Sequence, residues 1–215
     1  MFFKDRADAG RLLAIALEKF KDGNCVVYAL PRGGVVTAYE IAKYLRCPLD
    51  LIITRKIGHP SQPEYAIAAT AENGHIVGSE KEMSAIDEEW LKAAIEKERK
   101  EAGRRREKYL QGRKEVPAKG KIAILVDDGI ATGLTMRVAI KELKHRQPKK
   151  IIVATPVVPK DTAKVLRKEV DELIALEEPR EFYAIGEWYE NFPQVTDDEV
   201  TQLMEKVYEK NFYSD

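Results

Sequence analysis

Short aliphatic runs alternate with segments of helical periodicity along most of this chain. Short continuous apolar runs are typical of strands buried on both faces, whereas apolar residues at helical spacing indicate helices with one buried face. Strands are expected at 25–30, 49–54, 122–126, 151–156 and 172–176, and helices at 5–21, 35–45, 135–146 and 161–170. The alternation predicts an α/β fold, with a doubly wound, mostly parallel sheet flanked by helices.

Between the second and third of these strands the pattern is less regular. The stretch KIGHPSQPEY at 56–65 contains Gly58, Pro60 and Pro63, so we expect no regular structure there. The Asn-Gly pair within 72–74, flanked by apolar residues, predicts a β-hairpin.

A charged helix is expected at 84–111, because Ser84 and Asp87 have the spacing of a helix start. Residues 112–121 are the only segment with the composition of a linker. With no internal repeat and no low-complexity tract, the chain is expected to form one domain over 1–215 that carries the charged helix as an insertion.

Composition and charge argue against several classes of protein. Basic and acidic residues number 36 each, and a net charge of zero argues against a main role in gripping nucleic acid or anionic membrane. The two cysteines, Cys25 and Cys47, form no CxxC pair, and we expect them to be reduced and buried, as in an intracellular protein. The N-terminus lacks the pattern of a signal peptide and no stretch is long and apolar enough to span a bilayer, so a cytoplasmic protein is expected.

In the stretch ILVDDGIATGLTM at 124–136, a predicted strand is followed directly by two acids, Asp127 and Asp128. The glycines that follow let the backbone approach a ligand, and the N–H groups at the start of the next helix favour a phosphate. Thr132 and Thr135 add hydroxyl donors. The carboxylates would repel a phosphate and suit a vicinal diol, so a ribose 5-phosphate satisfies both halves of the motif.

Other loops fit this stretch less well. A Walker A loop requires a lysine that is missing here, and receiver domains carry paired acids nearer the N-terminus without the glycine and threonine residues. An ordinary strand–turn–helix with solvated acids is the remaining alternative. A second unusual turn, Pro31-Arg32-Gly33-Gly34, follows the strand at 25–30. Because ligands bind at the carboxyl ends of parallel strands, the two turns should open into one crevice if their strands are neighbours.

These residues resemble a known family. ILVDDGIATGLT is similar to the signature of the type I phosphoribosyltransferases, which binds the ribose phosphate of 5-phosphoribosyl-1-pyrophosphate, and it is most similar to the adenine-type version. LPRGG at 30–34 resembles the family's pyrophosphate loop. That loop often contains a cis peptide bond, so the resemblance implies one between Pro31 and Arg32 here. TRKIGHP at 54–60 resembles the mobile catalytic loop of orotate-type members. The resemblance covers about 25–176, and 177–215 would then form the variable hood that selects the base.

The resemblance implies transfer of ribose 5-phosphate to a nitrogenous base with loss of pyrophosphate. Asp127 and Asp128 would hold the diol. The 5-phosphate would be held by Ala131, Thr132, Gly133, Leu134 and Thr135, and the pyrophosphate by Arg32, Gly33, Gly34, Arg55, Lys56 and His59. Mg²⁺ is expected to be carried mainly by the oxygens of phosphoribosyl pyrophosphate, with no dedicated metal site in the protein. The catalytic residues would be Asp127, Asp128, Arg32, Lys56 and Glu64.

Family members that act on 6-oxopurines carry a third carboxylate at the position of Ala131. Because this chain has no acid there, another residue should manage the proton on the ring nitrogen of the acceptor, and Glu64 is the candidate. The departure argues against hypoxanthine and guanine as acceptors. Glu64 is the only carboxylate in 56–65, and Glu64-Tyr65 resembles a Glu-Tyr pair in the mobile loop of adenine-type relatives. We therefore expect Glu64 to act as a general acid or base. The alternative is that Glu64 only caps the strand that begins at Ala66.

The tail contributes aromatic residues and a final helix. EFYAIGEWYENF at 181–192 is aromatic-rich, and Trp188 is the residue expected to stack on the base, although such a cluster is equally typical of a core. Thr196 and Glu199 have the spacing of a capping box and predict the start of the last helix.

Two other functions remain open. A regulator of this fold would sense a sugar phosphate or nucleotide and bind RNA or DNA, and the basic residues in 103–113 are the feature that permits it. A hydrolase or phosphorylase would use the same crevice. The enzyme interpretation implies small-molecule partners, phosphoribosyl pyrophosphate and a base, with no membrane or nucleic acid. The family resemblance implies a homodimer.

Overall fold

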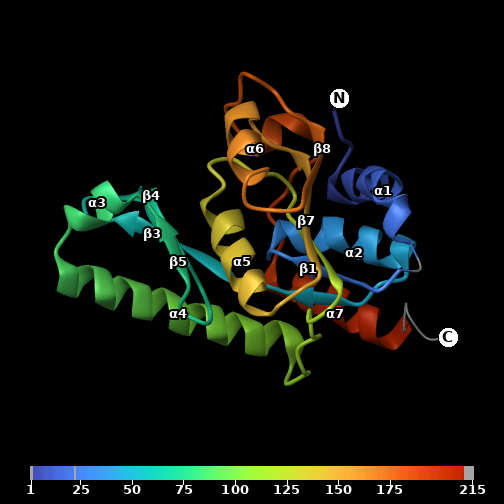
Figure 1. Cartoon of the computed structure of the whole chain (residues 1–215), viewed down its shortest axis with the longest axis horizontal. Helices are drawn as coiled ribbons and strands as arrows, with labels where there is room; N and C mark the ends of the chain where they lie inside the picture. Colours follow the sequence, from blue (N-terminus) through green and yellow to red (C-terminus); the bar gives the residue numbers. More distant parts are fainter. Residues whose placement is uncertain (1, 22, 211–215) are drawn as a thin grey trace.

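A five-stranded parallel sheet forms the centre of the protein (Figure 1). The structure is a computed structural model that describes residues 2–21 and 23–210. The sheet contains β1 (Cys25–Ala29), β2 (Leu49–Leu51), β6 (Ile122–Val126), β7 (Lys150–Val157) and β8 (Glu172–Glu177), in the order β2-β1-β6-β7-β8. Each neighbouring pair in this sheet is parallel, which confirms the predicted α/β fold.

Helices cover both faces of the sheet. Side chains along β1 alternate, so that Val26 and Tyr28 belong to one core and Cys25, Val27 and Ala29 to the other. One face packs against α1 (Arg6–Ala16), α2 (Gly33–Leu45) and α7 (Asp197–Lys210), and the other against α5 (Leu134–His145) and α6 (Lys160–Leu166). Burial on both faces explains why the central strands read as continuous apolar runs.

Strands β1 and β6 are direct neighbours, with Ala29 opposite Val126 at their carboxyl ends. Parallel neighbours end at the same edge of a sheet. The turns that follow them therefore meet there, as the sequence predicted.

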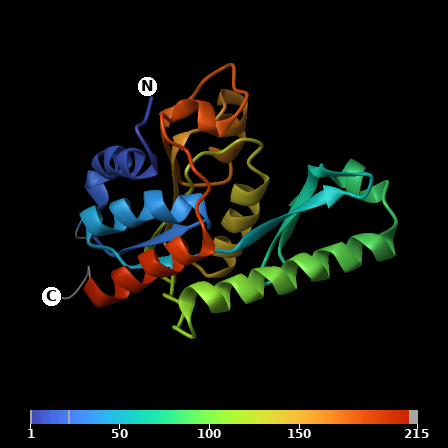
Figure 2. The same ribbon diagram turned by 180° about the vertical axis from the view of Figure 1, so that it is seen from behind.

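A second, antiparallel sheet extends from the core as a wing (Figures 1 and 2). The wing, residues 54–110, comprises β3 (Thr54–His59), β4 (Gln62–Ala71), β5 (Ile76–Gly78), α3 (Glu80–Ser84) and α4 (Glu88–Leu110). Ile57 and Ile67 are buried against apolar residues of α4, including Leu91 and Ile95, so the helix and the strands share a small core of their own. The hairpin expected around 72–74 is confirmed by the antiparallel pairing of β4 with β5.

The prediction that 56–65 would be irregular is wrong, because most of it lies in β3 and β4. A bulge accommodates the residues that disfavour a strand. Residues 63–65 of β4 lie between the pairs Gly58–Ala66 and His59–Gln62, where β3 has no counterpart. The missing N–H of Pro63 thus breaks no ladder hydrogen bond. A side chain on Gly58 would overlap the carbonyl group of Pro63, so a glycine permits the close approach.

The long charged helix α4 begins at Glu88, and the expected start at Ser84 is wrong. Ser84 instead ends the short α3, whose N-cap is Ser79. The N-cap of α4 is Asp87, which accepts a hydrogen bond from the backbone N–H of Trp90 at 2.8 Å. In the described part of the chain, no helix combines the length and the apolar character needed to cross a bilayer.

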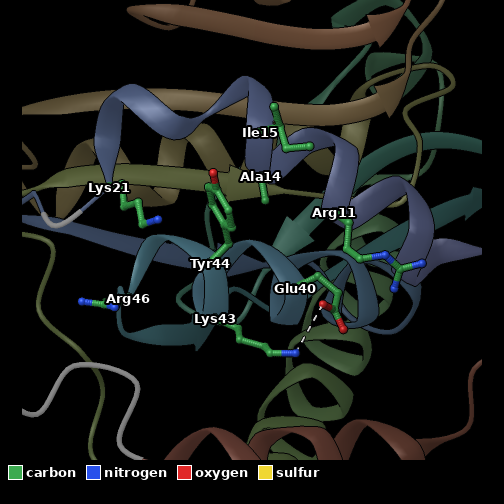
Figure 3. A pocket seen from close by; sticks show the side chains of 8 residues that line it. All are labelled: Arg11, Ala14, Ile15, Lys21, Glu40, Lys43, Tyr44 and Arg46. Atoms are coloured by element: carbon green, nitrogen blue, oxygen red, sulfur yellow. Dashed lines mark ion pairs between the residues drawn. The ribbon is translucent and has the colours of Figure 1, made fainter.

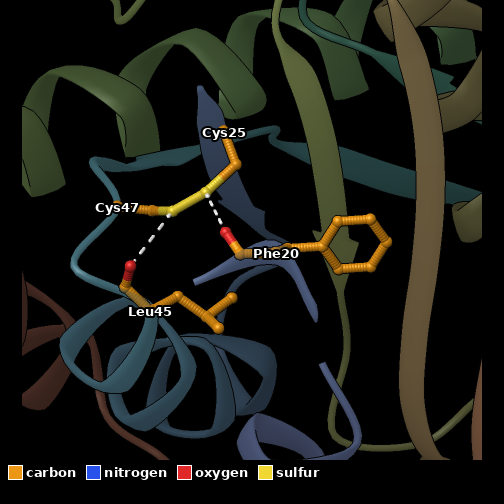
Figure 4. Close-up of a disulfide and its surroundings, with 4 residues drawn as sticks. All are labelled: Phe20, Cys25, Leu45 and Cys47. Carbon is orange, nitrogen blue, oxygen red and sulfur yellow. Dashed lines mark hydrogen bonds between the residues drawn. A yellow bond between two sulfur atoms is a disulfide. The ribbon is translucent and has the colours of Figure 1, made fainter. Parts of the chain in front are cut away.

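Cys25 and Cys47 are joined by a disulfide (Figure 4). The expectation of two reduced cysteines is therefore wrong, although both side chains are buried as predicted. Their Cα atoms are 5.8 Å apart, a usual separation for a disulfide. Cys25 begins β1 and Cys47 follows α2, which packs on that strand. The packing of α2 on β1 brings the two cysteines together, and their spacing in the sequence does not predict this pairing.

The tail packs against both the N-terminal segment and the core. Its 3₁₀ helix η2 (Ile185–Trp188) leads to Tyr189, which pairs with Phe3 in an isolated parallel bridge. The final helix α7 begins with the predicted capping box: Thr196 directly precedes the helix, Glu199 lies in its first turn, and the backbone N–H of each donates to the other's side chain. The expected last helix is thus confirmed.

Candidate functional site

The two turns touch through glycines at the start of α2. A β-carbon on Gly33 would overlap the carboxylate of Asp128, and one on Gly34 would lie 3.0 Å from Cα and Oδ1 of Asp127. Only residues without side chains allow this approach. The contact sets backbone N–H groups at a helix start beside two carboxylates.

Asp127 is half-buried directly after β6. Its Oδ1 accepts a hydrogen bond from the backbone N–H of Asp128 at 2.9 Å. Burial raises the pKa of Asp127 well above its usual value, the negative charge of Asp128 raises it further, and the Lys56 ammonium acts in the opposite direction. The charge of Lys56, on β3, therefore acts on Asp127.

Asp128 is paired with a residue that sequence reasoning missed. The Nε of Arg6 donates to Oδ2 of Asp128 at 2.5 Å, and its Nη1 donates to the backbone carbonyl of Pro193 at 2.7 Å. The Arg6 guanidinium lies over the ring of Phe192, 3.7 Å from its centroid. Only 9% of the Arg6 side chain is exposed. No signal in the sequence marks it, since a basic residue at the start of an amphipathic helix is usually solvated.

Aromatic residues of the tail form the wall beside Asp128. The hydroxyl of Tyr189 donates to the backbone carbonyl of Asp128 at 2.6 Å, and Tyr189 stacks with Phe192 at a centroid distance of 4.7 Å. Burial, followed by the charge of Asp128, raises the pKa of Tyr189, so its hydroxyl stays a donor. Trp188, the residue singled out from the sequence, instead stacks on Phe2 with centroids 6.2 Å apart.

Arg32 lies in the turn at 31–34, between β1 and α2. The Pro31–Arg32 peptide is cis, as the family resemblance implied. The Nη1 of Arg32 lies 3.5 Å from Oδ1 of Asp197, the first residue of α7. Asp197 also accepts a hydrogen bond from the hydroxyl of Tyr109 at 2.6 Å, so the arginine is held between α2 and the ends of α4 and α7.

The loop at 131–135 has the form of an anion site. Gly133 adopts a φ of +79° immediately before α5, a conformation that side chains disfavour. The carbonyl of Ala131 is fixed by the hydroxyl of Thr162 on α6, which donates to it at 2.8 Å. Within residues 2–21 and 23–210, the hydroxyls of Thr132 and Thr135 make no hydrogen bond, and Leu134 opens the helix whose first N–H groups face the turn.

The remaining candidates lie along the wing, which Figures 1 and 2 show running outward from the core. Successive side chains of β3 point to opposite sides, and the Nε of Arg55 donates to Oε2 of Glu98 on α4 at 2.8 Å. His59 and Glu64 lie next to the far turn of the β3–β4 hairpin, and Glu64 is exposed. Of the wing candidates, Lys56 thus acts electrostatically on Asp127, whereas Arg55 pairs with Glu98 and Glu64 is exposed.

A separate cleft of about 500 Å³ lies between α1 and α2 (Figure 3). Its lining includes four basic side chains, those of Arg11, Lys21, Lys43 and Arg46. Lys43 pairs with Glu40 within the cleft, at 3.9 Å. None of these residues belongs to the two turns, so the cleft is distinct from the candidate site.

The protein thus has an α/β fold in which paired acids and two helix starts meet at the carboxyl edge of the sheet. Residues 4–190 match the phosphoribosyl transferase domain family. The chain belongs to this family, which confirms the resemblance recognised from its motifs.

Relatives give the same assignment. Two Mycobacterium tuberculosis proteins with the provisional name phosphoribosyl transferase, Rv0571c and MT0597, are each 39% identical over 208 residues, 96% of this chain. That match covers 47% of their length, so the chain spans about half of these curated relatives. The crystal structure of TT1426 from Thermus thermophilus is similar with a TM-score of 0.81 and 36% identity, covering 96% of this chain and 99% of that one.

Proposed function

We propose that the chain is a phosphoribosyltransferase that transfers the ribose 5-phosphate group of phosphoribosyl pyrophosphate to a nitrogenous base and releases pyrophosphate. The observation that carries the proposal is the contact between Gly33-Gly34 and Asp127-Asp128. It sets N–H groups at the start of α2 beside two carboxylates. A ribose with pyrophosphate on C1 would need donors for the anion and acceptors for the diol side by side. Membership of the phosphoribosyl transferase domain family supports the same activity.

Each part of the crevice would bind one part of the donor. Asp127 and Asp128 would accept hydrogen bonds from the 2- and 3-hydroxyls. The loop 131–135 would bind the 5-phosphate through the first N–H groups of α5 and the open threonine hydroxyls. Arg32 and the N–H groups of Gly33 and Gly34 would bind the pyrophosphate.

The wing would supply further positive charge. Lys56 already acts on Asp127 and would lie near the donor's charged groups. Arg55 would reach the pyrophosphate only after leaving Glu98, and His59 only if the hairpin bends toward the core. Closure of the β3–β4 hairpin is therefore part of the proposal for these two residues.

The reaction breaks the bond between C1 and the pyrophosphate oxygen, and its electron pair leaves with pyrophosphate. A ring nitrogen of the base donates the pair that forms the new bond to C1. Positive charge develops on the sugar between these events, close to the two carboxylates. The protein would accelerate the reaction by positioning the partners and by electrostatic stabilisation.

The donor set of the crevice suits a cation that arrives on the substrate. One oxygen of Asp127 accepts a backbone N–H and one oxygen of Asp128 is paired with Arg6. In the described part of the chain there is no group of three or more His, Cys, Asp and Glu residues that could hold a metal ion. Mg²⁺ bound mainly by pyrophosphate oxygens would neutralise charge on the leaving group.

The alternative of an RNA- or DNA-binding regulator depended on the basic residues in 103–113. Arg104 and Arg105 both hydrogen-bond Glu101, and Arg106 hydrogen-bonds Glu72. These three side chains thus have acidic partners within the protein, which favours the enzyme.

A pyrophosphate-release screen tests the proposal, using phosphoribosyl pyrophosphate, Mg²⁺ and a panel of nucleobases. We expect release that requires both a base and Mg²⁺, and the base that supports it identifies the acceptor. A chain that binds phosphoribosyl pyrophosphate without turning over any base would contradict the enzyme. RNA binding that weakens steeply with salt would instead support the regulator.

A further inference from the structure

Arg6 joins three parts of the site that are distant in sequence. It comes from the first turn of α1, contacts the second acid of the signature, and packs against the tail at Phe192 and Pro193. The Arg6–Asp128 pair is nearly closed to solvent, with 9% and 12% of the two side chains exposed.

The geometry uses properties specific to arginine. A guanidinium is flat, so it can stack on Phe192 while its edge donates in the ring plane to Asp128 and to the carbonyl of Pro193. A lysine ammonium would keep the charge but has no flat face and no fixed fork of donors. Removing Arg6 would leave the Asp128 carboxylate buried beside Asp127 without this partner.

We propose that Arg6 positions the Asp128 carboxylate for the sugar diol and couples it to the tail segment at 192–193. The inference rests on the proposed function, and it assigns the N-terminal helix a role in binding the donor. With Oδ2 of Asp128 held by Arg6, the other carboxylate oxygen is the one that a ribose hydroxyl meets. Tyr189, which donates to the Asp128 carbonyl, holds the same residue from the tail.

The same contact offsets the repulsion between the two acids. Arg6 forms an ion pair with Asp128 from α1, whereas the Lys56 ammonium on β3 has only a small lowering effect on the pKa of Asp127. Without Arg6, the charge of Asp128 would be less compensated and would raise the pKa of Asp127 further, and a protonated carboxyl accepts hydrogen bonds from a diol poorly. The charged and titratable groups around Arg6, Asp127 and Asp128 are Asp5, Lys56, Tyr189 and Glu199.

The test compares Arg6→Met, Arg6→Gln and Arg6→Lys with the wild-type chain. Arg11→Met serves as a matched control, because Arg11 lies on the same helix with 56% of its side chain exposed and pairs with Asp8. Calorimetry measures the affinity for phosphoribosyl pyrophosphate with Mg²⁺, and for ribose 5-phosphate, between pH 6 and 9. Urea unfolding reports whether each variant is folded.

We expect Arg6→Met to weaken both ligands roughly 10–100-fold at pH 7, and part of that loss to be regained as the pH rises. Arg6→Gln should behave similarly, Arg6→Lys should lose less, and Arg11→Met should match the wild type. A purely structural role would lower stability without moving the pH at which binding improves.

Two outcomes separate the inference from the proposed function. If the wild type binds both ligands and a folded Arg6→Met or Arg6→Gln chain binds them within twofold, with the same pH profile, the inference is refuted alone. If the wild type binds neither ligand, the proposed function fails and the inference falls with it. The glutamine variant decides the question if the methionine variant does not fold.

Discussion

Gly33 and Asp128 lie so close together that a side chain on the glycine would occupy the space of the Asp128 carboxylate. The same added carbon would lie 2.8 Å from Nε of Arg6. The start of α2 can thus pack this closely against the residues after β6 only because position 33 is a glycine. The glycine pair of the 31–34 turn therefore packs directly against the acid that we propose binds the diol.

Gly33→Ala should therefore damage ligand binding more than it damages the fold. The methyl group would displace Asp128 or Arg6, and we expect the affinity for phosphoribosyl pyrophosphate to fall at least tenfold, about 1.4 kcal/mol. Calorimetry gives the affinity and urea unfolding the stability. Gly103→Ala is the control, because a β-carbon there meets no atom within 4 Å and the residue lies within α4. That variant should bind normally and should be unchanged or slightly more stable. Equal binding by both variants would contradict the fit described here.

The double variant Asp127→Asn with Asp128→Asn should lose sugar-phosphate binding while it remains folded. The amides keep the shape of the carboxylates but remove the charge that the diol hydroxyls and the developing positive charge require. Isothermal calorimetry with phosphoribosyl pyrophosphate measures the effect, and circular dichroism checks the fold. Unchanged affinity in the double variant would remove the diol assignment.

Arg32 should contact pyrophosphate when the donor binds. Arg32→Ala is expected to weaken phosphoribosyl pyrophosphate more than ribose 5-phosphate, because only the first ligand carries the group that Arg32 would hold. Lys43→Ala, at the opposite end of α2, is the control and should affect neither ligand. A ligand-bound crystal structure in which Arg32 still pairs with Asp197 and points away from pyrophosphate would contradict the assignment.

A buried carboxyl between the wing and the core should make stability depend on pH. Glu72 lies between Arg106, at 2.9 Å, and Arg146, at 3.7 Å. Burial raises its pKa from 4.5 to about 7, against the lowering effect of the two arginines. Because the folded-state pKa is the higher one, Glu72 stabilises the fold fully below the unfolded-state value, and this contribution is lost as the pH rises through about 7.

Relative to Glu72→Gln, the free energy of unfolding of the wild type should fall between pH 4.5 and pH 8 by up to roughly 3 kcal/mol. Urea unfolding of both proteins across this range measures the difference, and the variant subtracts all groups that titrate equally in the two. A difference that stays constant, or that grows in favour of the wild type as the pH rises, would show that the arginines keep Glu72 ionised.

The sequence predicted the parallel sheet because burial on both faces leaves a direct mark on composition. It also predicted that Asp127 and Gly34 would share a crevice, since neighbouring parallel strands end at one edge. It did not predict Arg6 or the Cys25–Cys47 bridge, because both depend on how helices pack onto the sheet. Local rules also failed where proline and glycine occupy a bulge, at Gly58, instead of ending a strand.

Glu64 provides the most demanding prediction, because the structure leaves it exposed near the far turn of the wing. Its neighbour Tyr65 donates to Oε1 of Glu82 at 2.5 Å, which holds this strand against α3. If the hairpin closes over the crevice during turnover, Glu64 would be shielded from water near the acceptor and could act as a general acid or base.

Glu64→Gln should then reduce kcat roughly 10²–10⁴-fold and leave the affinity for phosphoribosyl pyrophosphate nearly unchanged, because the residue would act only on the acceptor's proton. Steady-state rates with the best acceptor and calorimetric affinities separate these effects. Glu80→Gln, an exposed acid on the adjacent α3, is the matched control and should retain the wild-type rate. Turnover of Glu64→Gln at the wild-type rate would assign Glu64 to the surface of β4, and proton transfer would then have to depend on the acids already in the crevice.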